Sequence, residues 1–437
     1  MPFFLALIAL LALAGTVPAV AQPDRAVDAA SAAATFDTVW SRIKSSHYDT
    51  ALVGRPWDRA RDSLRPAAVA ARTRGELRGV LTALLGTLGE SHHVIIPEES
   101  FVAGADSDGG SAGTLGITVR LVEGVPVVVA LDSAGPAERA GVRTGWSLDS
   151  IGGRATAPIV AAALALGQSG PAVAATLLTN LATGPTDRDL IVAFGVPGGT
   201  RRLAVRPEEP TGTPVQFGTL PPQLVRVWSQ RHPTADGCVG VIGFSIWMMP
   251  VLPAFDRAVD GFRECRGIVI DLRGNPGGVI GLLMGVAGHF LDRADTLGTM
   301  RNRTSTIRIV ANPRRVTAAG VLVRPFAGPV AIVVDEMTGS ASELFAAGLQ
   351  ALGRARIIGT RTAGQALPAV AARLPSGDAL MHVIADFVTP AGRRVEAQGV
   401  VPDLPVPLER RALLEGRDRP IESAIAWIVT QPRGVSP

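Results

Sequence analysis

The C-terminal half of the sequence alternates short apolar runs with segments of helical spacing, and this alternation limits the fold more than any other feature. Runs such as CVGVIGF, GIVIDLRG and VAIVVDE are each followed by a segment whose apolar residues recur every three or four positions. Strands that alternate with helices form parallel βαβ units covered on both faces. Residues 220–430 are therefore predicted to form an α/β core that binds ligands beyond the carboxyl ends of its strands.

Ser340 stands where one apolar run gives way to a helical segment, SASELFAAGLQALG. Ser340 and Glu343 fit a capping box, in which the serine bonds an early helix N–H and the glutamate bonds back. The same position, after a buried strand, is where this fold class places chemistry, so Ser340 is equally a candidate nucleophile. The loop DLRGNPGG also ends an apolar run. It is either a plain turn or a source of N–H groups for an oxyanion.

The chain before this core is predicted to contain two further regions. Residues 26–103 are mostly of helical pattern, as in FDTVWSRIKSSHY and TRGELRGVLTALLGTLG, with Gly89 as a stop. A joint rich in glycine, serine and aspartate follows. Residues 112–210 then alternate strands with turns, and Pro136 is expected in the first turn of a short helix. The stretch APIVAAALALGQSGPAVAATLLTNLA has no assignment from its pattern.

The first residues, MPFFLALIALLALAGTVPAVAQ, predict a secretory signal peptide over residues 1–21, cut after the small residues Ala19 and Ala21. Because no basic residue precedes the apolar run, an uncleaved anchor is the alternative. We expect a periplasmic or secreted protein with no later membrane span. In an oxidising compartment Cys238 and Cys265 could pair, or they could remain buried thiols.

Composition argues against several classes of protein. Of the 437 residues, 47% are hydrophobic and 18% charged, which is enough for a core and too apolar for a disordered chain. The net charge is only +4 and the arginines are scattered, so no nucleic-acid partner is expected. The sequence has no CxxC, HExxH or Walker motif, and the adjacent His92 and His93 suit two ligands from one helix face poorly. No metal and no other cofactor is predicted.

Residues from about Phe36 to Trp427 resemble the tail-specific, or C-terminal processing, peptidases of serine peptidase family S41. The resemblance rests on the order of the helical region, the stretch SAGPAERAGVRTGWSLDSIGG, DLRGNPGG, and GSASELFAAGLQ followed by IIGTRTAGQ. It implies a crotonase-like α/β core and a PDZ-like peptide-binding domain over residues 112–210. In that domain Leu115, Gly116 and Ile117 would form the loop that holds a peptide carboxylate.

The resemblance also assigns catalytic roles. Ser340 would be the nucleophile, and the N–H groups of Ala341 and Gly277 would form the oxyanion hole. Common family members use a lysine as general base, but the matching position is Gln365, which cannot accept a proton at neutral pH. Lys44 is the only lysine of the chain and matches no family motif. The sequence therefore argues against a Ser–Lys dyad: either the enzyme is inactive or it uses another base.

The tricorn-protease-like branch of the family lacks this lysine and offers another base. Its Ser–His pair maps to Ser91 and His92 in LGESHHVIIP, and its carboxylate maps to Glu396, ahead of a Pro-Asp. His92 would be the base. Activity should then fall on the acid side with an apparent pKa near the ordinary histidine pKa, about 6–7. From the residues alone, the histidines could be a solvated pair and Glu396 an ion-pair partner of Arg393 or Arg394.

The predicted function is a serine endopeptidase with a Ser-His-Ser-Glu tetrad that cleaves an extended or unfolded polypeptide. Two other functions stay open at this point. The chain could be an inactive peptide- or apolar-ligand-binding protein, for which Gln365 is the best support, or an acyl hydrolase of non-peptide substrates. The sequence does not determine the natural substrate or the oligomeric state.

Overall fold

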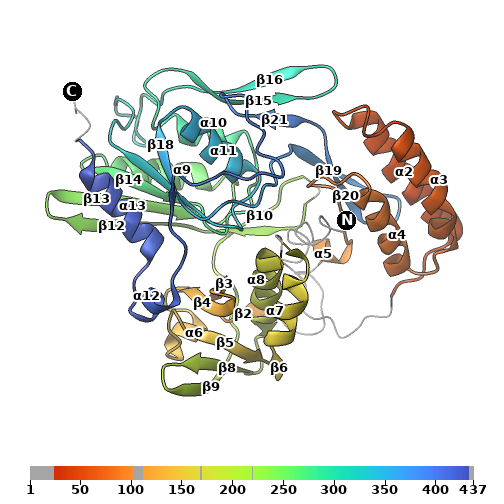
Figure 1. Cartoon of the computed structure of the whole chain (residues 1–437), viewed down its shortest axis with the longest axis horizontal. Coiled ribbons are helices and arrows are strands. Elements are labelled where there is room, and N and C mark those ends of the chain that lie inside the picture. The colour runs from red at the N-terminus through yellow and green to blue at the C-terminus, as the bar shows by residue number, and fades with distance from the viewer. Residues whose placement is uncertain (1–23, 103–111, 168–169, 219, 433–437) are drawn as a thin grey trace.

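The computed structural model describes residues 24–102, 112–167, 170–218 and 220–432 (Figure 1). The predicted signal peptide, residues 1–21, lies outside them. The described chain forms an N-terminal group of helices, a middle region of strands and helices, and a C-terminal core. Each region has its own cluster of buried apolar side chains.

A six-stranded sheet forms the centre of the core, in the order β12-β13-β14-β17-β18-β22. Its strands are β12 (Val227–Thr234), β13 (Gly237–Phe244), β14 (Gly267–Asp271), β17 (Val330–Val334), β18 (Ala355–Gly359) and β22 (Leu404–Pro405). β12 and β13 are antiparallel, and every other neighbouring pair is parallel. The carboxyl ends of β14 and β17 therefore meet at one edge of the sheet.

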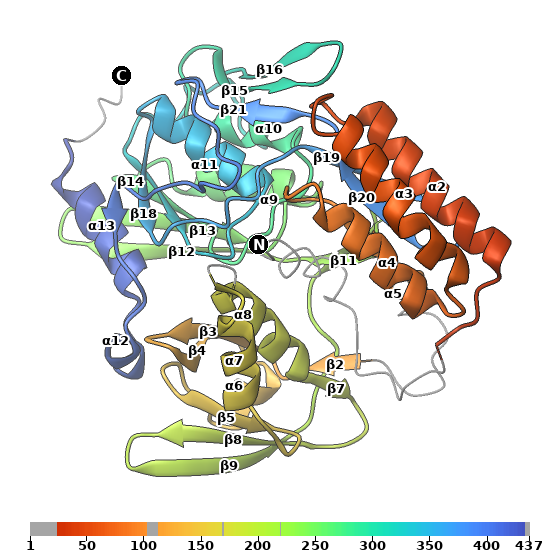
Figure 2. The same cartoon turned by 45° about the vertical axis from the view of Figure 1, so that its right-hand side comes forward.

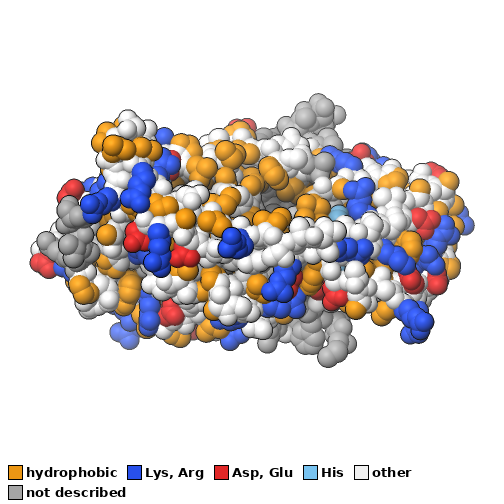
Figure 3. All heavy atoms as spheres, turned by 90° about the horizontal axis from the view of Figure 1, so that it is seen from above, with side chains coloured by type: hydrophobic (Ala, Val, Ile, Leu, Met, Phe, Trp, Pro, Cys, Tyr) orange, Lys and Arg blue, Asp and Glu red, His pale blue; other side chains and the backbone are white. Residues whose placement is uncertain are grey.

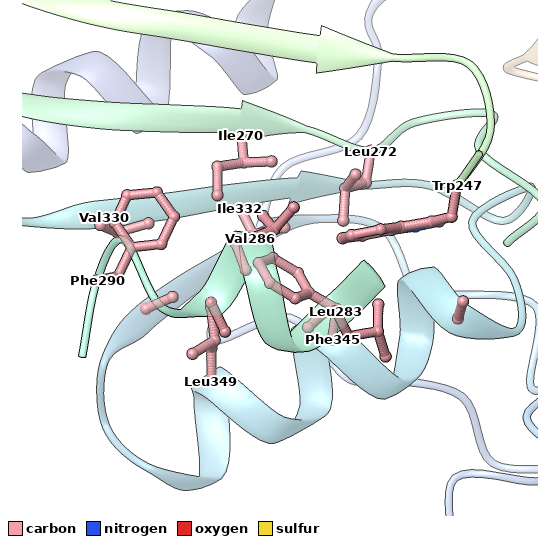
Figure 4. Packing of buried hydrophobic residues seen from close by; sticks show 14 of the residues in the cluster. Trp247, Ile270, Leu272, Leu283, Val286, Phe290, Val330, Ile332, Phe345 and Leu349 are labelled. Atoms are coloured by element: carbon pink, nitrogen blue, oxygen red, sulfur yellow. The ribbon is translucent and has the colours of Figure 1, made fainter. Parts of the chain in front are cut away.

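Helices cover both faces of this sheet, as its apolar strands require. They are α9 (Val251–Gly261), α10 (Leu282–Ala287), α11 (Ala341–Ala351) and α13 (Arg419–Thr430). Ile268 and Ile270 point to the cluster under α9, α10 and α11, whereas Val269, between them, points to α13. Figure 4 shows the first cluster, where Ile270 faces side chains such as Phe345. The predicted α/β core is confirmed.

The N-terminal region is a group of three helices with its own apolar core. They are α2 (Ala29–Ser46), α3 (Arg55–Ala70) and α4 (Arg74–Gly86). After α4 the chain turns at Gly89, whose φ of 66° favours glycine. The helices lie beside the core strands β19 (Ala369–Arg373) and β20 (Ala379–Val383) (Figure 2).

A short strand helps to join the N-terminal helices to the core. β1 (Val94–Ile96) pairs antiparallel with β20, with Val94 opposite Met381 and Ile96 opposite Ala379. Arg78 of α4 adds an ion pair to the fully buried Asp378, 2.6 Å away. These contacts fix the segment before β1, residues 89–93, against the core although it is far from the core in sequence.

The middle region contains a sheet in the order β3-β4-β5-β8-β9, with β6 paired to β5. Its strands are β3 (Ile117–Val122), β4 (Val125–Leu131), β5 (Ser147–Ile151), β6 (Arg154–Ala155), β8 (Leu190–Val196) and β9 (Gly199–Val205). α6 (Pro136–Arg139) begins with Pro136, as predicted. The stretch without an assignment forms α7 (Ala157–Leu164) and α8 (Gly170–Leu181), and α8 packs against β3.

Arg120 of β3 connects the middle region to the edge of the core sheet. Its Nε donates to Asp335 Oδ2 at 3.1 Å, just after β17, and both side chains are nearly buried. The other oxygen of Asp335 accepts from Gly274 N at 2.8 Å. A single aspartate thus links the middle region to the glycine-rich loop that follows β14.

The remaining elements are small or peripheral. They are α5 (Glu99–Val102), β2 (Ala112–Thr114), β7 (Thr183–Pro185), β10 (Thr213–Val215), β11 (Gln223–Val225), β15 (Asp295–Arg301), β16 (Thr306–Ala311), β21 (Asp386–Val388) and α12 (Arg410–Leu414). A disulfide joins Cys238 to Cys265. Over the described ranges, no helix is both long and apolar enough to cross a bilayer. Basic and acidic side chains are interspersed on the face in Figure 3, with hydrophobic side chains near its middle.

Candidate active site

Ser340 has a backbone conformation that a helix-capping serine does not need. It follows β17, begins α11, and has φ 51° and ψ −122°. An ordinary N-cap residue lies in the extended region, and positive φ is costly for a residue with a Cβ. A sharp, strained strand-to-helix turn is how nucleophilic serines are presented at the end of a strand. The backbone of Ser340 therefore favours the nucleophile over a simple cap.

A buried glutamate, Glu343, holds the turn at Ser340 in place. Ser340 N–H donates to Glu343 Oε2 at 3.2 Å and to the carbonyl of Gln365 at 2.8 Å. Glu343 also accepts from Gly364 N at 2.7 Å, Gln365 N at 2.8 Å and the hydroxyl of Thr362. Burial raises the pKa of Glu343 to about 7 despite these bonds. Gln365, at the position of the family lysine, thus serves the site through its backbone.

Ser91, His92 and Glu396 form one buried hydrogen-bonded unit. Ser91 Oγ is 2.8 Å from His92 Nδ1 and donates to Glu396 Oε2 at 3.0 Å. Ser91 N–H donates to the other oxygen of Glu396 at 3.0 Å. Since the single hydroxyl proton of Ser91 goes to the carboxylate, Nδ1 of His92 must donate to Ser91 Oγ. His92 Nε2 is then left unprotonated and can act as a base.

Burial sets the charge of this unit. The pKa of His92 is lowered to about 4 by burial and by the neighbouring His93, so His92 is neutral at pH 7. This value is well below the 6–7 expected from the sequence, because the sequence does not show that the imidazole is only 8% exposed. Burial raises the pKa of Glu396, while its bonds to Ala366 N and Ser91 oppose the rise.

Two hydrogen bonds to the adjacent residues Gln365 and Ala366 connect the backbone of Ser340 with the Ser91–His92–Glu396 unit. Ser340 N bonds the carbonyl of Gln365, and the next residue, Ala366, donates its N–H to Glu396 Oε2 at 2.8 Å. Segments around residues 91, 340 and 396 therefore meet at one site. Lys44 is not part of this connection. It pairs with Asp58 on the N-terminal helices.

The two predicted oxyanion donors lie beside Ser340. A Cβ added to Gly277 would come within 2.5 Å of Ser340 Cβ and 2.8 Å of Ala341 N, and Gly277 has φ 105°. Only glycine fits so close a contact. Ala341 is the first residue of α11, where N–H groups have no partner within the helix. Gly277 N–H donates to Asn275 Oδ1 at 3.0 Å, a bond that an incoming oxyanion would have to share.

In the middle region, two of the predicted carboxylate donors already have partners. Leu115 N–H donates to the carbonyl of Ala182 at 2.9 Å, and Gly116 N–H donates to Thr114 Oγ1 at 3.1 Å. Ile117 begins β3, the edge strand of its sheet. The sequence did not indicate the bond of Leu115, since it depends on the packing of Ala182 between α8 and β7, whereas the bond of Gly116 is local.

Sequence reasoning missed several residues that shape the site. Trp247 Nε1 donates to Ser342 Oγ at 2.9 Å, so Ser342 is a buried partner of the core. The sequence predicts only a capping role for Glu343 and no role for Glu90, which precedes Ser91. One group of side chains among the described residues, His47, Glu90 and His93, has the donor atoms for a metal ion. The clustering of histidines with a glutamate was the available signal.

Residues 239–406 match the sequence profile of peptidase family S41. The matched residues span most of the core, and together with the relatives below they show that the protein is a serine-type peptidase. Carboxyl-terminal-processing peptidase 3, chloroplastic, of Arabidopsis thaliana is 26% identical over 407 residues, or 90% of this chain and 72% of the relative.

Two solved structures share the fold. The photosystem II D1 C-terminal processing protease has a TM-score of 0.58 and 21% identity, with 92% of this chain and 99% of that chain covered. Tricorn protease has a TM-score of 0.50 and 19% identity over 92% of this chain, but only 37% of the tricorn chain is covered.

Proposed function

We propose that the protein is an endopeptidase that cleaves extended polypeptides through an acyl-enzyme, with Ser340, His92, Ser91 and Glu396 as its catalytic tetrad. The observation that supports this most is the buried Ser91–His92–Glu396 unit, whose bonds leave His92 Nε2 free of a proton. An inactive binding protein would have no need of this tautomer. Gln365 at the position of the family lysine also requires a base other than lysine.

In this mechanism Ser340 Oγ attacks the scissile carbonyl while His92 Nε2 takes its proton. The N–H groups of Ala341 and Gly277 stabilise the oxyanion. The imidazolium formed at His92 is stabilised through Ser91 by ionised Glu396, and it then gives its proton to the leaving amine. A water molecule then attacks the acyl-enzyme while His92 takes its proton. His92 returns this proton to Ser340 Oγ, and the acyl product leaves.

We also propose that residues 112–210 form a PDZ-like domain that binds the polypeptide. β3 is an edge strand with α8 packed against it, so an extended segment can add to the sheet there. Capture of a terminal carboxylate at Leu115, Gly116 and Ile117 would require the internal bonds of the first two N–H groups to be shared. The ion pair of Arg120 with Asp335 gives binding at β3 a direct contact to the loop beside Gly277.

A periplasmic or secreted location is part of the proposal. The apolar start of the sequence and the disulfide between Cys238 and Cys265 both support it, because disulfides persist in oxidising compartments. N-terminal sequencing of the protein recovered outside the cytoplasm tests it. A mature chain beginning at Gln22 is expected, and recovery of the whole chain in the cytoplasm would contradict the proposal.

A fluorophosphonate probe tests the catalytic assignment. It should label the peptide that contains Ser340 in the native chain, and labelling should fall strongly in His92→Gln because no base remains. Ester and peptide substrates are then compared with an unfolded polypeptide. Absence of labelling would favour the binding-protein alternative, and labelling with cleavage of esters alone would favour a non-peptide acyl hydrolase.

A further inference from the structure

A cluster of three potential metal ligands lies next to the proposed catalytic pair. His47 Nε2 is 2.7 Å from Glu90 Oε2, and His93 Nε2 is 3.6 Å from the same oxygen. The three ligand atoms all lie within 4.8 Å of one another. The two imidazole rings are nearly parallel, at 21°, with centroids 5.5 Å apart. Two imidazoles thus converge on one carboxylate oxygen.

His93 has no hydrogen bond to satisfy its ring. Both of its ring nitrogens are buried without a hydrogen-bond partner, and its side chain is 1% exposed. Buried polar groups are normally paired. A neutral imidazole with an unused lone pair, aimed at a carboxylate, is the form in which histidine binds metals.

The carboxylate of Glu90 is held in position by groups behind it. Tyr48 O–H donates to Oε1 at 2.7 Å and accepts from Arg394 at 2.8 Å. Oε2 is thereby directed at the two imidazoles. Such partners behind a ligand orient it and raise affinity for the metal.

His47 has two backbone partners on its far side. Its Nδ1 accepts from Asp49 N–H at 3.1 Å and lies 3.3 Å from Asp49 O. With Nδ1 as the acceptor, the ring proton is on Nε2, so a metal bound at Nε2 requires that proton to move to Nδ1, where the Asp49 carbonyl can accept the new hydrogen bond. A ligating histidine commonly donates its other N–H to a backbone carbonyl in this way.

A second buried His–carboxylate pair shows what an ordinary structural pair looks like in this chain. His289 Nε2 is 2.7 Å from Asp256 Oδ1, as close as His47 is to Glu90. There the third group is the guanidinium of Arg314, 2.8 Å from the other oxygen of Asp256. A fixed cation at that position balances the carboxylate and excludes a metal ion. At Glu90 the third group is instead the ring of His93.

We infer that His47, Glu90 and His93 bind one Zn²⁺ ion. Two imidazole nitrogens and one carboxylate oxygen form a ligand set that zinc uses, with the fourth position left for water. Zn–ligand distances near 2.0 Å place ligand atoms about 3.3 Å apart, so the present separations need only small side-chain shifts. Mg²⁺ and Ca²⁺ prefer oxygen ligands and are not expected to bind. Glu90 and His93 flank Ser91 and His92, so bound zinc restrains both ends of the catalytic segment.

Isothermal titration and metal analysis of the tag-free, chelator-treated Ser340→Ala chain test the inference without interference from autolysis. One Zn²⁺ per chain is expected. His93→Leu removes a ligand without removing a hydrogen bond, and Glu90→Gln keeps an acceptor for Tyr48. Each should weaken Zn²⁺ binding by more than about 100-fold, since loss of partners behind a ligand alone costs 10–100-fold.

His289→Gln is the matched control and should bind Zn²⁺ like the parent. Zn²⁺ should also raise the melting temperature of the parent and not that of His93→Leu. The inference is overturned if the parent takes up no more Zn²⁺ than His93→Leu, or if His289→Gln alone loses the ion. Adding His92→Gln should leave the affinity within a few-fold, and loss there would place the ion on the catalytic histidine instead. These readouts do not depend on whether the chain is an active peptidase.

Discussion

The two halves of the site are built in different ways. The nucleophile half, Ser340 with Ala341, lies between β17 and α11, whose residues are nearly all buried and close in sequence. The base half, Ser91 and His92, lies between α4 and β1 and meets its partner Glu396 across 305 residues. One half is therefore fixed by its own strand and helix and by the nearby residues 362–365, and the other by contacts between distant segments.

This difference determines how each half responds to change. Around Ser340 a side-chain substitution leaves the strand, the helix and the turn in place. Around His92 the position of the ring depends on β1–β20 pairing and on Glu396, so remote substitutions can displace it. We expect the nucleophile half to fail by loss of its own atoms or of its nearby support at Glu343, and the base half to fail also by loss of remote support.

The largest effect is expected at Ser340. Ser340→Ala should lower kcat by roughly 10⁵-fold or more on a peptide substrate, because the attacking oxygen is lost. Its melting temperature should not fall, since the strained backbone needs no hydroxyl. Ser342→Ala is the neighbouring control. It loses the bond from Trp247, which costs about 1 kcal/mol of stability, and should retain most activity. Full activity of purified Ser340→Ala would refute the assignment.

His92→Gln should reduce kcat nearly as much as Ser340→Ala, because members of a catalytic unit fail together. His289→Gln replaces another buried histidine and keeps a donor for Asp256, so its kcat should stay close to that of the native enzyme. The measurement is kcat for both variants on one peptide. Equal losses in the two variants would show that a buried histidine matters only for the fold.

Glu396→Gln should lower kcat by about 10²–10⁴-fold, because His92 loses the bonds that select its tautomer and stabilise its charge. In the native enzyme the acid limb of kcat/KM should lie below pH 6.5, toward the His92 pKa of about 4, since activity is lost as His92 gains a proton. In Glu396→Gln the limb should move to still lower pH, as no carboxylate favours the imidazolium. If the pH–rate profile of Glu396→Gln has the same acid limb and the same maximal rate as that of the native enzyme, Glu396 is not part of the site.

Arg78→Ala tests whether the base half depends on remote support. It leaves Asp378 buried without its cation, beside the β1–β20 pairing, and should cost about 1–3 kcal/mol of stability. Because β1 carries the segment of Ser91 and His92, kcat should fall several-fold even at temperatures where the chain is folded. Arg65→Ala, which breaks an exposed pair with Asp37 on the same helices, is the control and should change neither.

The smallest effect is expected at Gln365. Gln365→Ala should stay within about twofold of native kcat, because only the backbone N–H and carbonyl of Gln365 contact the site. Gln365→Lys should not restore activity to His92→Gln, since an ammonium would need strong desolvation to act as a base. Substantial rescue would identify the chain as a drifted Ser–Lys peptidase.

The α/β core and the place of Ser340 could be predicted because strand–helix alternation is a local property of the sequence. The helix pair α7–α8 could not be predicted, since alanine-rich segments can pack in many ways. The position of β3 determines how this pair packs. Ser91, His92 and Glu396 were found only through the family resemblance, because no local pattern reports a contact across 305 residues. The pKa of His92 and the partner of Ser342 depend on burial, which the complete fold determines.

Backbone strain is concentrated around the proposed tetrad. Five non-glycine residues of the described chain have positive φ: His92, Glu123, Ala134, Ser340 and Ala397. Three of them are site residues or, like Ala397, directly follow one. Each such residue costs on the order of 1 kcal/mol or more. A selection for thermal stability alone should therefore enrich glycine at these positions. At Ser340 and His92 the more stable chain would be inactive, whereas Ala397→Gly would give stability without removing a catalytic atom.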